Sequence, residues 1–267
     1  MRIKKTVADR TTRDMPSVIG WVSADTILRG KIRLVQRWGI WFSVEGDLRF
    51  GSHHQMLRAA ERLILRTKLP VRFSQGFNPR PAVSLPCPKP VGISACRELL
   101  LVELDPWAEG DVQWLPQEIL RIVRSQALAD MDVIDAQPLP PTPAYRPVRA
   151  WYDMDVTADE SVILAERLAQ IHKLTSWQVL RRPCEDKSAR PAKSLDLRNF
   201  IESLELEGGR LCWQSVPYAD IWARPAELLG FVGLDERADL ARVVRRQIRF
   251  DPHIETLQSE GSFQSPN

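Results

Sequence analysis

The first half of the chain carries apolar residues whose spacing predicts a regular order of strands and helices. Trp38, Ile40 and Phe42 alternate with other residues, which indicates a strand. Ser52 and Gln55 have the spacing of a helix capping box, and the apolar residues after them recur at helical intervals. The predicted elements are strands at 37–43, 71–74, 81–85, 98–104 and 131–137, and helices at 52–68 and 115–128. When the short strands at 71–74 and 81–85 are counted as one strand, the order is βαββαβ, that of a ferredoxin-like unit.

The second half repeats this order more loosely. Its hairpin turns at Gly208 and Gly209, which favour a tight connection between strands. The predicted elements are strands at 150–156, 177–180 and 243–250, a hairpin at 204–216, and helices at 159–172 and 227–232, with an insertion around 184–200. We therefore expect an α+β fold made of two tandem ferredoxin-like units with antiparallel sheets.

Proline and polar segments divide the chain. Five prolines fall in PLPPTPAYRP, which cannot form a helix or a central strand and so predicts a stiff linker at 139–148. The polar N-terminus predicts a mobile extension at 1–30, and the C-terminus a disordered tail at 253–267. The two units are then expected at 31–138 and 149–252.

Composition is that of a globular protein. The chain has 267 residues, of which 44% are hydrophobic and 27% charged. It contains no apolar run of the roughly 18–20 residues that a membrane span needs, and no apolar segment follows its basic N-terminus. We expect a cytoplasmic protein with no membrane partner, whose cysteines are reduced thiols: Cys87, Cys96, Cys184 and Cys212.

Positive charge is concentrated in one stretch. The net charge is only +3, but residues 31–80 hold ten Lys and Arg against three Asp and Glu. A locally basic segment favours an anionic partner such as RNA, a nucleotide or a phosphate. The alternative is a solvated helix face without a partner.

Several kinds of chemistry have no support in the residues. The cysteines form no CxxC pair, and His53 and His54 point in different directions on a helix, so we expect no metal site. The chain has no GxGxxG or GxxxxGK[ST] loop and no serine in a nucleophile elbow. We therefore expect no cofactor and no independent catalysis.

Two polar turns and one basic strand supply the candidate binding residues. The first turn offers Asp47, Arg49 and His53 at a helix start, where free N–H groups suit anions. The second turn offers Gln75, Asn78 and Arg80, for which turn formation and surface ion pairing are the alternatives. In the second half the candidates are Arg198 and the arginines of 242–249, with Arg245 and Arg249 expected on one strand face, Arg246 on the other, and Trp213 and Trp222 either exposed beside them or in the core.

The stretch from 42 to 104 resembles a known family. The blocks FSVEGDLRFGSHHQMLR and SQGFNPRPAVS, followed by a Pro/Gly segment, are similar to FSKTGDLRFISHLDLMR and SQGFNPHPKIS of the bacterial radical SAM-linked protein family, a domain of unknown function. SLDLRNFI and RPAELL extend the resemblance more weakly into the second half. The chain departs from the usual pattern at Val44, Gln55 and Arg80, where the family has Lys, Asp and His.

This resemblance implies a partner. Such domains are fused to radical S-adenosylmethionine enzymes or encoded separately, and this chain, which lacks a CxxxCxxC motif, resembles the stand-alone form. The favoured hypothesis is an accessory protein that binds RNA, or a substrate carried on RNA, and works with a separately encoded radical SAM enzyme. One alternative, by analogy with pseudouridine synthases, is an RNA-modifying enzyme with Asp47 as its catalytic carboxylate. The other is a purely structural interaction module.

Overall fold

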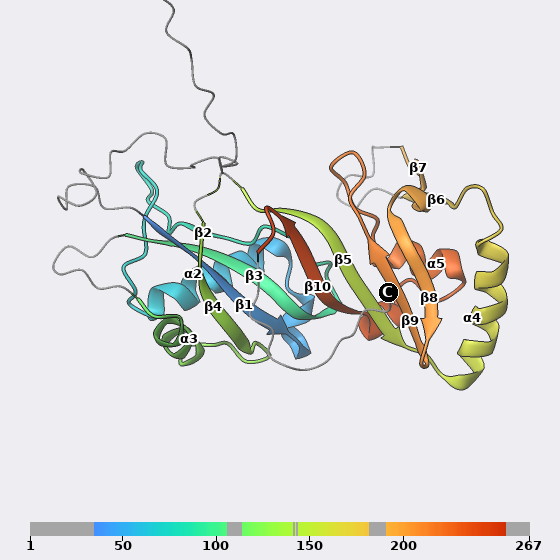
Figure 1. Ribbon diagram of the computed structural model, residues 1–267, viewed down its shortest axis with the longest axis horizontal. Helices are drawn as coiled ribbons and strands as arrows, with labels where there is room; N and C mark the ends of the chain where they lie inside the picture. Colours follow the sequence, from blue (N-terminus) through green and yellow to red (C-terminus); the bar gives the residue numbers. More distant parts are fainter. Residues whose placement is uncertain (1–34, 106–113, 141, 143, 182–190, 255–267) are drawn as a thin grey trace, which may run out of the picture. The chain divides into compact units, whose positions relative to one another are not determined.

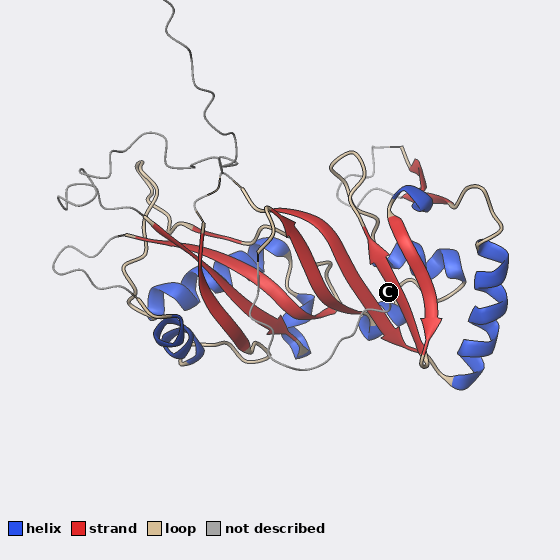
Figure 2. Cartoon of the chain, in the orientation of Figure 1, coloured by secondary structure: helices blue, strands red, loops and turns tan. Residues whose placement is uncertain are grey.

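The structure is a computed structural model that describes residues 35–105, 114–140, 142, 144–181 and 191–254 (Figure 1). The extension predicted at 1–30 lies outside these residues, as does the predicted tail from 255 onward. The described residues of both halves belong to one compact unit. Its main feature is an eight-stranded, mostly antiparallel sheet, in which seven strands follow the order β4-β1-β3-β10-β5-β9-β8 and β2 pairs with β3 (Figure 2).

The first half contributes four strands and two α-helices. Strand β1 pairs with β3 and β4 on either side, and β2 adds a short antiparallel pairing to β3. Apolar residues of one sheet face pack with α2 and α3 in a single core cluster that includes Trp38, Leu63 and Ile119. The elements are β1 (Gln36–Val44), α2 (His53–Arg66), β2 (Val83–Ser84), β3 (Ser94–Leu104), α3 (Pro116–Arg124) and β4 (Val133–Leu139), with a 3-10 helix η1 at Gly46–Phe50.

The second half contributes the other four strands of the sheet. A second core cluster packs Tyr152, Trp213 and neighbouring sheet residues against α4 and α5. The elements are β5 (Arg146–Asp155), α4 (Ala158–Ile171), β6 (Gln178–Arg181), β7 (Lys193–Asp196), β8 (Ile201–Glu207), β9 (Arg210–Ser215), α5 (Pro225–Val232) and β10 (Val244–Asp251), with 3-10 helices η3 (Leu197–Asn199) and η4 (Asp239–Arg242).

Strand β10 joins the two halves into one sheet. It lies antiparallel to β5 and parallel to β3, where only two residue pairs form, Val244 with Ser94 and Arg245 with Ala95. The Arg245 side chain also contacts Cys87, in the loop after β2. The α+β class and the mostly antiparallel pairing are confirmed, but the halves share one sheet.

Most predicted elements exist close to their expected positions. The Ser52 capping box, the hairpin β8–β9 and strand β10 are confirmed. The strand expected at 71–74 makes only isolated bridges, at Val71 and Phe73. Strand β6 forms where a strand was expected, but it pairs with β7 from the predicted insertion and not with the main sheet.

The ends of the predicted linker at 139–148 belong to strands. Leu139 is the last residue of β4, and β5 already begins at Arg146.

In the described part of the chain, no helix is long and apolar enough to cross a membrane.

Candidate nucleic-acid interface

The loop between α2 and β2 projects from the first half as a closed tip (Figure 1). Its base is fixed by two hydrogen bonds, from the Ser74 N–H to the Arg80 carbonyl at 2.8 Å and from the Arg80 N–H to the Ser74 hydroxyl at 2.9 Å. Gly76 takes φ +147°, a conformation that L residues rarely adopt. Between Ser74 and Arg80, the Phe77 side chain is fully exposed, at 105% of its reference area. An aromatic ring held out in water on a closed loop is available for stacking.

A shallow hollow of about 350 Å³ lies where this loop meets the outer face of α2. We call it the α2 hollow, and its lining residues are His54, Leu57, Arg58, Glu61, Arg62 and Arg80. The helical residues face the same way because they are three or four positions apart. The inner face of α2 is apolar and buried, so this outer face is left to charged residues.

The α2 hollow holds three arginines against a single carboxylate, Glu61. Arg58, Arg62 and Arg80 are exposed, and no ion pair joins any of them to another residue that the structure describes. Nine other described arginines are in ion pairs, as Arg72 is with Glu103 at 3.2 Å. Unpaired guanidiniums grouped around one hollow attract phosphate.

The first polar turn lies outside this hollow. The Asp47 N–H donates to the Asp130 carboxylate at 2.9 Å, and Arg49 donates to the Ala241 carbonyl at 3.1 Å. His53 has its ring 5.9 Å from that of His54, and burial, followed by the charge of His54, lowers the pKa of His53. Of the residues predicted in the two turns, only Arg80 is therefore brought to the α2 hollow. Gln75 and Asn78 are exposed in the loop beside it.

The basic strand 242–249 differs from the prediction. A β-bulge between Arg245 and Gln247 shifts the register against β5, so Arg245 and Arg249 do not share a face. Arg245 is only 2% exposed and forms a buried ion pair with Glu98 at 2.6 Å. It cannot contact a ligand at the surface, and that prediction is wrong. Arg249 remains exposed.

The other arginines that were predicted to bind RNA in the second half bond to other residues of the protein. Arg242 is paired with Glu160 at 2.7 Å, and Arg246 with Asp153 at 2.8 Å. Arg198 donates to the Leu174 carbonyl at 2.9 Å. Of the two tryptophans, Trp213 is buried in the core and Trp222 packs against it, so neither is an exposed platform.

Lys89 was not predicted as a special residue. It is buried, and its ammonium donates to the carbonyls of Arg49 at 2.7 Å, Ile93 at 2.9 Å and Pro90 at 3.0 Å. Burial lowers its pKa to about 8, although Glu98 acts in the opposite direction. Its only local signal was a lysine placed between two prolines. We infer that these three hydrogen bonds fix the conformation of the loop before β3.

A model of one protein family matches residues 37–224 of the chain, under the description "uncharacterized protein conserved in bacteria (DUF2344)". The chain belongs to this family. No curated protein matches it significantly. The family match covers the α2 hollow and the loop 74–80, whereas Arg245 and the rest of β10 lie beyond its end.

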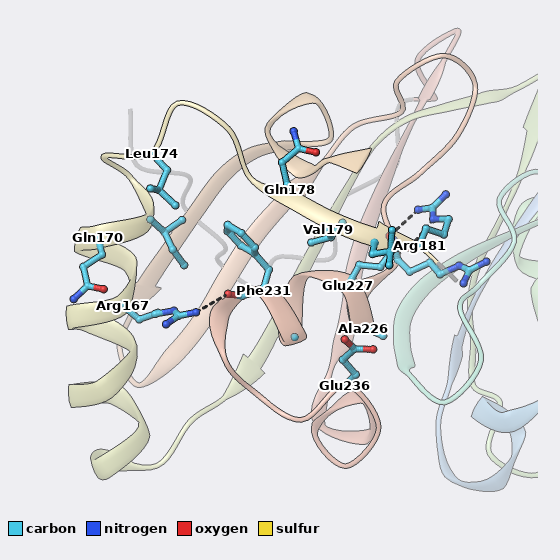
Figure 3. Close-up of a pocket in the computed structure, with 14 residues that line it drawn as sticks. Arg167, Gln170, Leu174, Gln178, Val179, Arg181, Ala226, Glu227, Phe231 and Glu236 are labelled. Atoms are coloured by element: carbon cyan, nitrogen blue, oxygen red, sulfur yellow. Dashed lines mark hydrogen bonds and ion pairs between the residues drawn. The ribbon is translucent and has the colours of Figure 1, made fainter. Parts of the chain in front are cut away.

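A second hollow of this family member, of about 750 Å³, lies between α4, α5 and β6 (Figure 3). Phe231 contributes an apolar wall, and Arg167 reaches its backbone carbonyl at 3.5 Å. Arg181 is held on Glu227 by two hydrogen bonds of 2.5 and 2.7 Å. With Arg181 paired to Glu227, this hollow keeps two arginines, Arg167 and Arg224, against Glu236, whereas the α2 hollow has three arginines against Glu61. Sequence reasoning did not predict this hollow, because its residues come from segments far apart in the chain.

The described residues contain no group of three or more His, Cys, Asp or Glu placed to hold a metal ion. The Cys87 thiol is buried, which raises its pKa, and Arg245 acts in the opposite direction. Cys184 lies outside the described residues. The chemistry that the exposed arginines of the α2 hollow support is binding of an anion.

Proposed function

We propose that this protein binds RNA, or a substrate carried on RNA, and presents it to a separately encoded radical SAM enzyme in the bacterial cytoplasm. The observation that carries the RNA part is the α2 hollow. Its three arginines form no ion pair, and the loop that contributes Arg80 also exposes Phe77. Phosphate attraction together with a free ring is the combination that RNA-binding surfaces use. The radical SAM part rests on the SQGFNP resemblance.

The finer fold assignment supports the same proposal. The strand orders β4-β1-β3-β2 and β10-β5-β9-β8 are each the order of a ferredoxin-like unit, and every pairing within each set is antiparallel. We propose that the molecule consists of two such units fused edge to edge, with β6–β7 inserted in the second. Sheets of this kind occur in RNA-binding modules, which is an argument by analogy only.

An enzyme that modifies RNA through Asp47 is the second candidate, and it has less support. The Asp47 side chain is exposed on the short 3-10 helix η1 and does not line the α2 hollow. A catalytic carboxylate would need to reach the bound base. The arginine nearest to Asp47 in sequence, Arg49, does not help to bind RNA there, because it donates to the Ala241 carbonyl.

The test is an RNA-binding titration with matched variants. Arg58→Gln combined with Arg62→Gln should weaken binding of a mixed-sequence RNA by tenfold or more at low salt, because two phosphate contacts are lost. Asn78→Ala and Arg80→Ala should leave the melting temperature nearly unchanged, since neither side chain bonds to another described residue, while Arg80→Ala also weakens binding.

Arg237→Gln is the control for the loss of charge. Arg237 is exposed on a turn of the second half, outside both hollows. If the α2 variants bind RNA as well as the Arg237→Gln protein does, the α2 hollow is not the binding site.

A further inference from the structure

The basic residues of α2 are spaced like the phosphates of a nucleic-acid strand. His54, Arg58 and Arg62 follow one another at intervals of four residues. At a rise of about 1.5 Å per residue, each interval advances about 6 Å along the helix. This is close to the separation of successive phosphates along one RNA strand. A strand laid along α2 can therefore place successive phosphates at Arg58 and Arg62, and Arg80 of the adjoining loop can take a further one.

The loop 74–80 supplies a stacking surface beside this row. Arg80, at the base of the loop, lines the same hollow as Arg58 and Arg62, so the loop lies next to the helix face. Phe77 at the tip is fully exposed, and no other described aromatic ring stacks on it. A lone ring in water has lost the burial that normally holds a phenylalanine inside a protein. A base can cover it.

We infer that the α2 hollow binds a single-stranded segment of RNA, with its phosphates along Arg58, Arg62 and Arg80 and one base stacked on Phe77. This inference rests on the proposed function and narrows its substrate class. Bases within a duplex are stacked on one another and do not offer a free face to the Phe77 ring. A single strand offers both a regular phosphate row and free bases, and stacking tolerates any base sequence.

Asn78 fits the same arrangement. It follows Phe77 directly and is exposed, so its amide is free to contact a base stacked on the ring. An amide both donates and accepts hydrogen bonds, which suits the edge of a base. The loop therefore pairs sequence-independent stacking with one polar group that can favour particular bases.

The experiment compares two RNAs and four variants. A ten-nucleotide single strand with 2-aminopurine near its centre, and the same strand annealed to its complement, are titrated with the full-length protein. We expect the single strand to bind at least tenfold more tightly than the duplex, and its 2-aminopurine fluorescence to change on binding. Phe77→Ala should weaken single-strand binding by about tenfold and remove most of this change. Phe77→Trp should retain both.

Tyr218→Ala is the control for loss of an exposed aromatic side chain, because Tyr218 lies in the second half and is 54% exposed, with its ring edge-on to Phe200. Melting curves check that each variant is folded, and the exposure of Phe77 gives no reason for a loss of stability. Equal binding of the single strand and the duplex, or a Phe77→Ala protein that binds like the Tyr218→Ala protein, overturns the inference. If Arg58→Gln still weakens binding in that case, the proposed function stands. If neither RNA binds at low salt, the proposed function itself fails.

Discussion

Lys89 is a buried cation whose position depends on backbone carbonyls and not on a single carboxylate partner. Its three acceptors belong to Arg49, Pro90 and Ile93, so the ammonium connects η1 with the loop that leads into β3. Removal from water disfavours the charged form, which is why its pKa falls from 10.5 to about 8. The deprotonated amine would keep only two N–H donors for three carbonyls.

This depressed pKa predicts a particular pH dependence of stability. Between about pH 8 and 10.5 the unfolded chain holds the Lys89 proton while the folded protein releases it. The free energy of unfolding contributed by this group therefore rises with pH there, by at most about 1.4 kcal/mol per pH unit. Lys89→Met removes the effect. Urea unfolding of both proteins at several pH values should show the difference, wild type minus variant, increasing from neutral pH upward.

Other alkaline groups do not obscure this comparison. Burial raises the pKa of Cys87 and of Tyr152, and these groups lower stability as the pH rises because the unfolded state loses their protons first. Both groups are present in the wild type and in the Lys89→Met protein. A difference that stays constant with pH would show that Lys89 is charged equally well in both states.

Sequence reasoning at the residue scale worked where the environment is local. The exposed positions of Asn78 and Arg80 followed from the proline- and glycine-rich loop around them. It was wrong in placing Arg245 and Arg249 on one face, because strict alternation along β10 ignores the bulge between Arg245 and Gln247. It also could not pair Arg245 with Glu98, which is 147 positions away in the chain.

At the scale of elements, α4 begins at a capping box that also ties it to η4. The Thr157 hydroxyl accepts from the Glu160 N–H at 3.2 Å, and the Glu160 carboxylate accepts from the Thr157 N–H at 2.7 Å. Arg242 of η4 bonds to the same carboxylate and, with the Thr157 N–H, lowers the pKa of Glu160 to about 2. The start of the helix and the entry to β10 are thus held by one carboxylate.

Thr157→Ala should lower the free energy of unfolding by about 1 kcal/mol, the typical cost of losing an N-cap side chain. Thr175→Ala is the matched control, since Thr175 is exposed after α4 and caps no helix. Chemical denaturation of the two variants measures the difference. Equal stability of both would mean that the Glu160 and Arg242 contacts define the helix start without the hydroxyl.

Helices α2 and α4 differ in how well the spacing of their apolar residues predicts the buried face. In α2 the apolar residues form one stripe, and the predicted face is the buried one. In α4 apolar residues occur on more than one side, and the structure buries Leu164 while Val162 and Ile163 are 63% and 68% exposed. A helix with two apolar faces is oriented by what packs against it, here β8 and α5, and the sequence alone does not contain that choice.

At the scale of the molecule, the joining of the halves was the least predictable feature. Hydrophobic spacing locates strands within a half, because neighbouring residues share a strand. The parallel pairing of β10 with β3 involves two residue pairs between segments about 150 positions apart, which no local pattern marks. The predicted basic surface changed for the same reason, since Arg242, Arg245 and Arg246 find carboxylate partners in distant segments.

This pairing lowers the number of free cations available to RNA, and that number sets the salt dependence of binding. Each neutralised phosphate contributes about −0.7 to the slope of log affinity against log salt for a single strand. With Arg58, Arg62 and Arg80 as the unpaired arginines of the α2 hollow, we expect a slope of about −2 near neutral pH. Arg58→Gln should reduce the slope by about 0.7, whereas Arg237→Gln should leave it unchanged. Titrations at four salt concentrations distinguish these values. A slope of −4 or steeper would mean that arginines outside the α2 hollow, such as Arg249 on the exposed side of β10, also contact the strand.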